Sequence, residues 1–309
     1  MSRRNKSLEL LSFVWMVGIV LFHSGNGAPL WYSTILSDFR IGGVSYFFIV
    51  SGYFFVRHYD ERPLRQWWNG ELAKRFRSLA IPYFLWCLLG LSGFDFLRQF
   101  GITSLGPTAN PPLWYIKFLF LFCLAAPIFA PVIKRMSNSR FFLPGFAVAG
   151  LVLPWIPLPM KFCLVVSLWM FLFGVGLSFC GHSTTFCNWL LPTSMAVWVL
   201  LYCLRLTQYA NIPAIDWPLR VYSAVALMVT AYLAVRRIGE LRSLPSFVSM
   251  SFFVYCSHAL LLRHLHLPLP SGTVGCFLKG CAAVALALTI GCFLRHFAGS
   301  VYSLLCGKR

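Results

Sequence analysis

The sequence predicts an all-α fold, a polytopic integral membrane bundle of about ten transmembrane helices, and three observations support this prediction. Hydrophobic residues make up 59% of the 309 residues and charged residues 11%, whereas soluble domains are roughly 25% charged. Apolar runs of about 20 residues, the length that crosses a bilayer, recur along the chain. Lys and Arg gather in alternate loops. Together these observations exclude a soluble globule, a coiled coil and a small disulfide-stabilised domain.

The apolar runs are separated by short polar or Pro- and Gly-containing breaks, such as Gly106-Pro107 and the stretch from Pro154 to Pro159. At a rise of about 1.5 Å per residue, each run can cross the hydrocarbon layer as a helix. No linker is long enough to divide domains, so we expect one integral membrane domain over residues 1–309. In chain order, the expected spans are residues 8–24, 41–57, 78–97, 113–133, 141–159, 161–180, 188–205, 218–235, 246–263 and 274–294.

The basic residues predict the orientation of these spans. The chain has 26 Lys and Arg against 8 Asp and Glu, a net charge of +18. Of the 26, 18 fall in the termini and the second, fourth and eighth loops, and 6 fall in the alternate loops. The positive-inside rule therefore places both termini in the cytoplasm. Basic loops attract anionic membrane lipid, and no basic stripe lies on a hydrophilic domain, so nucleic acid is not an expected partner.

Ionisable side chains inside the expected spans are the first functional candidates, because each costs several kcal/mol unless it faces protein or water. His23 lies about 22 Å from the inner face, and His258 lies about 18 Å from it. A helix-packing role for His258, and snorkelling of the two lysines to the outer interface, remain alternatives. The five candidates are Glu9, His23, Lys117, His258 and Lys279.

A basic cluster, Lys74-Arg75-Phe76-Arg77, marks the expected cytoplasmic start of the third span. Arg and Lys suit phosphate groups because they donate charge-assisted hydrogen bonds. Most of the titratable candidates lie in the outer half of the membrane. The cluster would then bind an anionic donor on the cytoplasmic side, and the reaction would take place deeper in the membrane. Basic residues at an inner helix end are also ordinary topology determinants, so both interpretations stay open.

Six strings along the chain resemble segments of the acyltransferase family 3 membrane proteins. They follow the family's order across residues 7–262, from its opening helix to the Tyr-x-x-His segment of its ninth span. The strings are SLELLSFVWMVGIVLFHS (7–24), GGVSYFFIVSGYFF (42–55), KRFRSLAIPYFLW (74–86), PPLWYIKFLFLFCLAAPIF (111–129), FLFGVGLSF (171–179) and SMSFFVYCSHALLL (249–262).

This resemblance implies transfer of an acyl group, commonly acetyl, from cytoplasmic acyl-CoA to a hydroxyl of a cell-surface or lipid-linked glycan. It also implies a multi-pass protein of the bacterial inner membrane. Acyl-CoA is then a co-substrate, and we expect no resident cofactor and no metal. The expected partners are membrane lipid, acyl-CoA, the glycan acceptor and polysaccharide-assembly proteins.

The resemblance implies a catalytic role for His23, which matches the first-helix His of the family. The family usually has an Arg eleven positions earlier, where this chain has Ser12. Eleven helical steps return to within about 20° of the same face, so Ser12 shares that face but supplies no charge. Either another cation substitutes, with Arg75 and Arg77 as candidates, or the protein is impaired.

The remaining site residues follow from the family's needs, since the donor's phosphates require cations and the oxyanion requires hydrogen-bond donors. Ser51-Gly52-Tyr53 also fits close helix approach. Two other functions stay open, a transporter or flippase of a glycan or lipid-linked precursor and an inactive partner in polysaccharide assembly. We assign Lys74, Arg75, Arg77, Ser51 and Tyr53 to the donor site, and Glu9, Trp114, Lys117, Tyr255 and His258 to substrate binding or support.

Overall fold

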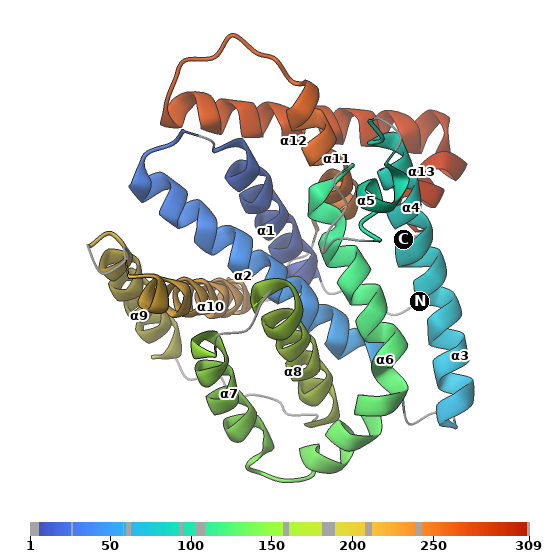
Figure 1. Cartoon of the computed structure of the whole chain (residues 1–309), viewed down its shortest axis with the longest axis vertical. Helices are drawn as coiled ribbons and strands as arrows, with labels where there is room; N and C mark the ends of the chain where they lie inside the picture. The colour runs from blue at the N-terminus through green and yellow to red at the C-terminus, as the bar shows by residue number, and fades with distance from the viewer. Residues whose placement is uncertain are drawn as a thin grey trace. The chain divides into compact units, whose positions relative to one another are not determined.

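The computed structural model describes residues 6–25, 27–57, 59, 63–92, 95–102, 109–156, 161–180, 189–207, 212–238 and 243–307, with the backbone alone for 161–163 and 213. Every regular element within these ranges is helical, which confirms the all-α prediction (Figure 1). The α-helices are α1 (Lys6–Ser24), α2 (Leu30–Phe55), α3 (Leu64–Arg75), α4 (Ile81–Leu89), α5 (Phe96–Gln99), α6 (Trp114–Ser137), α7 (Phe142–Val152), α8 (Ser167–Cys180), α9 (Leu190–Arg205), α10 (Pro213–Ile238), α11 (Ser251–His264), α12 (Thr273–Phe297) and α13 (Gly299–Leu305).

Each expected run overlaps a helix, but the helix that contains the second expected span, residues 41–57, begins well before it. α2 begins at Leu30 rather than at residue 41. Its charged residues looked like loop positions, yet both are covered by neighbouring helices. Asp38 binds Arg205, and the Arg40 guanidinium lies 4.2 Å from the centre of the Phe22 ring. Partners from distant segments let the helix continue through these charges.

The expected third span, residues 78–97, is also shifted. α3 runs through a π-helical turn, Phe76–Ala80, into α4, so one helical segment extends from Leu64 to Leu89. Gly90 caps its end, and the Gly90 N–H donates to the Cys87 carbonyl at 3.0 Å. The basic cluster therefore lies within this segment and not at its start.

Five helical segments are long and apolar enough to cross a membrane: Lys6–Ser24, Pro111–Ser137, Ala214–Arg237, Ser246–His264 and Thr273–Phe297. Shorter apolar helices cover Phe142–Trp155, Leu164–Cys180 and Leu190–Arg205. Several apolar helices of this kind support the prediction that the chain is a membrane protein. The count of ten spans and the cytoplasmic termini stay predictions.

Arg65 tests the predicted orientation, because it belongs to the strongly basic second loop of the charge count and lies in α3. The positive-inside rule predicts that Arg65→Cys reacts with a membrane-impermeant maleimide only from the cytoplasmic side. Labelling is compared with that of the parent protein, which has 11 native cysteines. Extra labelling from the outer side would overturn the whole placement.

The chain divides into two compact units, and α2 contributes to both. The first unit holds Met1–Val44 and Thr185–Tyr302, and the second holds Ser45–Thr184 and Ser303–Arg309. In the first, α1 packs against α11 and α12, and α9 packs against α10 (Figure 1). In the second, α6 packs against α3 and α8. The prediction of one domain over the whole chain stays a prediction.

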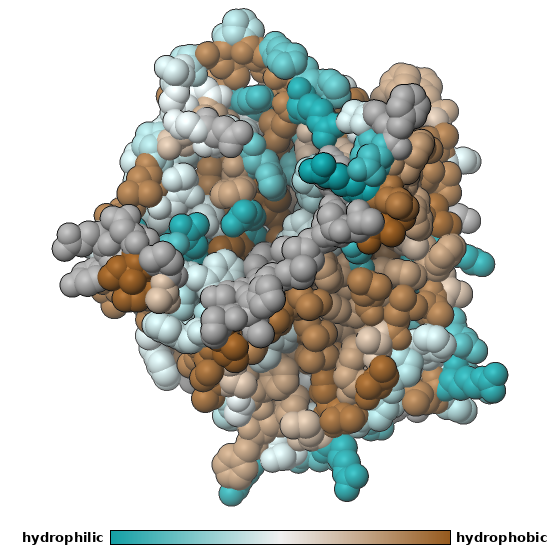
Figure 2. Space-filling model, in the orientation of Figure 1, coloured by the Kyte–Doolittle hydropathy of each residue, from teal (hydrophilic) through white to brown (hydrophobic). Residues whose placement is uncertain are grey.

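Large apolar side chains remain exposed along the outer surfaces of the long helices. Figure 2 shows apolar side chains gathered over α6, where Ile128 is 78% exposed. A soluble protein seldom leaves such a broad apolar surface uncovered, whereas a lipid-facing helix requires one. In the described helices, these exposed apolar surfaces are suited to contact with the hydrocarbon tails of membrane lipids.

Gly52 and Gly174 explain how α2 and α8 approach closely in the second unit. A Cβ at Gly52 would collide with the Phe171 carbonyl, and one at Gly174 with the Ile49 carbonyl. Small residues of this kind let membrane helices pack backbone against backbone. The close-approach alternative for Ser51-Gly52-Tyr53 therefore holds at Gly52.

Candidate functional site

His23 lies at the C-terminal end of α1, where its side chain is exposed. The neighbouring Ser24 is buried, and its hydroxyl lies within hydrogen-bonding distance of the Cys276 carbonyl of α12 at 2.9 Å and of the Leu21 carbonyl at 2.8 Å. Gly280 leaves no room for a Cβ beside Leu21 and Ser24. These contacts fix the end of α1 against α12 and so position His23.

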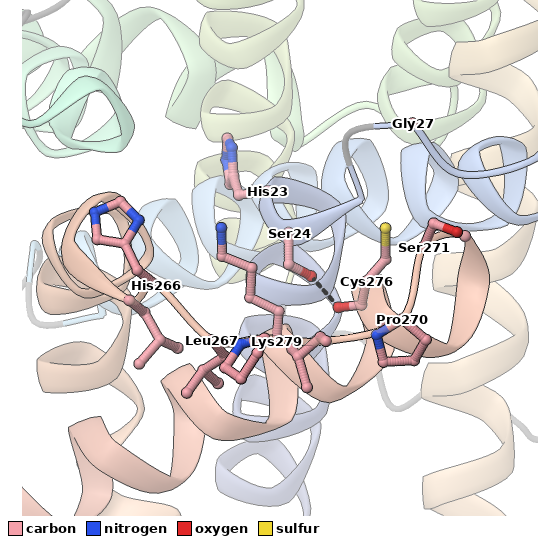
Figure 3. A pocket seen from close by; sticks show the side chains of 14 residues that line it. His23, Ser24, Gly27, His266, Leu267, Pro270, Ser271, Cys276 and Lys279 are labelled. Carbon is pink, nitrogen blue, oxygen red and sulfur yellow. Dashed lines mark hydrogen bonds between the residues drawn. The ribbon is translucent and has the colours of Figure 1, made fainter.

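An open pocket of about 740 Å³ lies at this end of α1 (Figure 3). Its wall is formed by the last residues of α1, the connection 265–272 and the first turns of α12. The wall contains the basic side chains of His23, His266 and Lys279, together with the hydroxyls of Ser24 and Ser271 and the thiol of Cys276. The volume falls within the range of roughly 300–1,000 Å³ that is usual for small-molecule sites. The pocket therefore has room for a substrate beside His23.

His258 of α11 is fully buried, and its ring centre lies 5.2 Å from that of His23. Its Nδ1 is 2.5 Å from the Tyr255 carbonyl. A carbonyl oxygen only accepts, so Nδ1 carries the hydrogen and Nε2 keeps a lone pair. Within the described ranges, that Nε2 has no hydrogen-bond partner. Two histidines from different helices thus adjoin, one exposed and one buried with an unused acceptor.

Tyr255, Ser12 and Glu9 also belong to the first unit. Tyr255 is buried, with its ring centre 5.8 Å from that of His258. The Ser12 hydroxyl donates to the Leu8 carbonyl at 2.8 Å, within α1. Glu9 is in the first turn of α1, about 21 Å along the helix from His23. None of these three side chains lines the pocket.

Arg40 is a cation that the sequence analysis missed, because it was counted in an outer loop. It lies in α2, half-buried, and its guanidinium covers the ring of Phe22, the residue before His23. The first unit therefore supplies its own cation near His23, even though Ser12 carries no charge.

The predicted basic cluster is partly neutralised by Glu71, a buried residue one helical turn earlier. Lys74 Nζ lies 2.5 Å and an Arg75 guanidinium nitrogen 3.5 Å from the Glu71 carboxylate. The Arg75 guanidinium also lies 5.4 Å from the centre of the Phe55 ring. Arg77 is exposed and lines a second open pocket, of about 580 Å³, between α3 and α6. The cluster is thus two paired cations and one that faces a pocket.

The other predicted residues of the second unit lie on α2 and α6. The Ser51 and Tyr115 hydroxyls are 3.3 Å apart, whereas Tyr53 is 40% exposed. Trp114 begins α6 and is half-buried. Lys117 Nζ donates to the Gly101 carbonyl at 2.5 Å. Lys117 is therefore held by a backbone carbonyl of the segment 95–102.

The structure brings His23, His258 and Tyr255 together in the first unit, and the remaining predicted residues, except Glu9, lie in the second. Sequence reasoning omitted His266 and left Lys279 out of the final site. The position of Lys279 inside an expected span had marked it as a functional candidate. His266 follows α11 in a connection without periodicity, so no pattern marked it.

Comparison with known proteins identifies the family of the chain. The family model described as the acyltransferase domain of acyltransferase family 3 matches residues 5–296. No curated protein and no solved structure gives a match. The family match includes both histidines, the basic cluster and the wall of the His23 pocket. The chain belongs to acyltransferase family 3.

Proposed function

We propose that this protein transfers an acyl group, most simply acetyl, from cytoplasmic acyl-CoA to a hydroxyl of a cell-surface or lipid-linked glycan. Family membership supports acyl transfer as the class of reaction. The observation that carries the proposal is the exposed His23 imidazole in an open pocket, backed by a buried second histidine. The proposed location is the bacterial inner membrane, where the acyl donor and a surface-glycan precursor can meet.

The proposed reaction needs a base, and a neutral His23 imidazole can serve as one. His23 takes the proton from the acceptor hydroxyl as its oxygen attacks the thioester carbonyl. The carbon–sulfur bond then breaks, the acyl group stays on the acceptor oxygen, and the CoA thiolate leaves. The imidazolium returns the proton to that thiolate, so the enzyme ends unchanged.

His258 fits the role of a positioning residue for His23. Its buried Nε2 is an acceptor without a partner among the described residues, and leaving such a group unpaired costs about 1–3 kcal/mol. An N–H of His23 can satisfy it after a small ring rotation, because the ring centres are 5.2 Å apart. That bond would fix the His23 tautomer and leave its other nitrogen free to accept the hydroxyl proton.

For the donor, we propose that Arg77 contacts the phosphates of acyl-CoA. Because Arg77 is exposed, Arg77→Gln is expected to weaken acetyl-CoA binding by about 1–3 kcal/mol, the value of a charge-assisted contact. Lys74→Gln is expected to cost less, since Lys74 is already bound to Glu71. Binding of labelled acetyl-CoA to the purified protein measures both. Arg135→Gln, at the end of α6, is the control. Unchanged affinity in Arg77→Gln and Arg75→Gln would leave the cluster as a topology signal only.

A transporter or flippase of a glycan or lipid-linked precursor is the alternative function. The open pocket beside His23 favours it as much as it favours an enzyme, since a carried glycan needs a site too. The two differ in the fate of the acyl label. A purified protein that moves a glycan across vesicles, and never incorporates acyl label, would support transport.

A further inference from the structure

Lys279 is the strongest feature that the proposed reaction leaves unused. It lies in the second turn of α12 and lines the same pocket as His23. Figure 3 shows its amino nitrogen turned towards His23, with the His266 ring facing the same space. Within the described ranges, no ion pair and no hydrogen bond engages this ammonium group.

Of the five described acidic residues, four bind groups elsewhere, and Glu9 lies in the first turn of α1, about 21 Å along the helix from His23. No Asp or Glu is in the pocket wall. Asp38 pairs with Arg205, and Asp216 with Arg220. Glu71 binds the basic cluster, and Asp95 accepts from the Arg98 N–H. In this part of the chain, the protein therefore supplies no counter-ion for the ammonium group in the pocket.

The other groups of the wall also favour a negative charge. An ammonium group offers three hydrogen-bond donors and no acceptor, and an imidazole offers at least one N–H. The first turn of α12 borders the pocket without a side-chain cap, so the positive end of its dipole adds to the Lys279 charge. Apart from these groups, the wall is mainly Leu, Pro and Gly. A cationic pocket with a mixed polar and apolar lining suits an anion on a larger molecule.

We infer that the acceptor carries an anionic group, a carboxylate or a phosphate, which Lys279 and His266 hold while a hydroxyl of the same molecule lies at His23. This inference rests on the proposed function, because it assigns the pocket to the acceptor. Two sources offer such a charge, an acidic sugar and the pyrophosphate of a polyprenyl-linked glycan. A neutral glycan would leave the ammonium group without a partner.

Binding measured without any acyl donor tests the inference. The probes are two matched pairs, tetragalacturonate with its methyl ester and farnesyl pyrophosphate with farnesol. The purified wild-type protein is expected to bind the charged member of at least one pair about 10- to 100-fold more tightly than the neutral member. The pair that shows this preference identifies an acidic sugar or a pyrophosphate as the source.

Variants of Lys279 show whether the preference arises in this pocket. Lys279→Gln is expected to remove it, and Lys279→Arg to retain most of it. Lys134→Gln, in α6, is the control and is expected to bind as wild type does. Equal binding of charged and neutral probes by the wild type, or an unchanged preference in Lys279→Gln, would overturn the inference. Because no acyl-CoA is present, these binding results can overturn the inference without deciding whether the protein transfers an acyl group.

Discussion

Replacing His23 with Ala is expected to lower the rate of acyl transfer by about 10²- to 10⁴-fold, the usual contribution of a general base. The reason is that no other described imidazole in this wall lies beside the buried His258. The rate is measured with purified protein, labelled acetyl-CoA and a glycan extract of the source cells. Binding of acetyl-CoA should persist, because the proposed donor contacts lie on α3 and its π-helical extension.

His258→Gln gives the matched comparison for this loss. It removes the imidazole acceptor but keeps His23, so the rate is expected to fall less than in His23→Ala. Thermal unfolding of both variants checks that the bundle remains intact. Near wild-type transfer by a folded His23→Ala protein would remove His23 from the mechanism and leave His258 as the next candidate.

Replacing Asp38 with Ala is expected to destabilise the fold by about 3–5 kcal/mol, because it leaves Arg205 buried without its counter-ion. Asp38 is fully buried, and Arg205 is 4% exposed. The Asp38 carboxylate also accepts from the Ser223 hydroxyl at 2.6 Å and from Trp198 Nε1 at 3.1 Å. This one carboxylate therefore links α2, α9 and α10. Thermal unfolding in detergent micelles measures the loss.

Asp216→Ala is the control, since its partner Arg220 is 41% exposed and such a pair is worth about 1 kcal/mol or less. The double variant Asp38→Ala/Arg205→Met is expected to recover much of the lost stability, because it removes the unpaired charge as well. Unfolding of Asp38→Ala at the wild-type temperature would show that this ion pair does not hold the three helices together.

The helical character of the fold was predictable from the sequence because lipid demands long apolar segments. Depth counting also placed His23 and His258 at similar levels, and the structure sets their rings 5.2 Å apart. The hydrophobic periodicity of a segment and the length of an apolar run are local properties of the sequence. They therefore reveal where a helix runs and how deep a residue lies in it.

Pairing between helices is not a local property, and there the sequence analysis fell short. Asp38 and Arg205 are 167 positions apart, so no spacing rule connects them. Arg40 was expected in a loop, because no spacing rule predicts that its guanidinium lies over the Phe22 ring of another helix. Glu71 lies only one turn from the basic cluster, and its neutralising effect could have been read from the i, i+3 and i, i+4 spacing.

Acceptor-dependent release of CoA from acetyl-CoA by the purified wild-type protein tests the central claim, acyl transfer, most directly. With labelled acetyl-CoA and the glycan extract, the account predicts one free CoA thiol for each acetyl group found as an alkali-labile ester. It also predicts that omitting the extract abolishes both products. A folded protein that binds or moves the glycan, yet releases no CoA and forms no ester in its presence, would contradict the account.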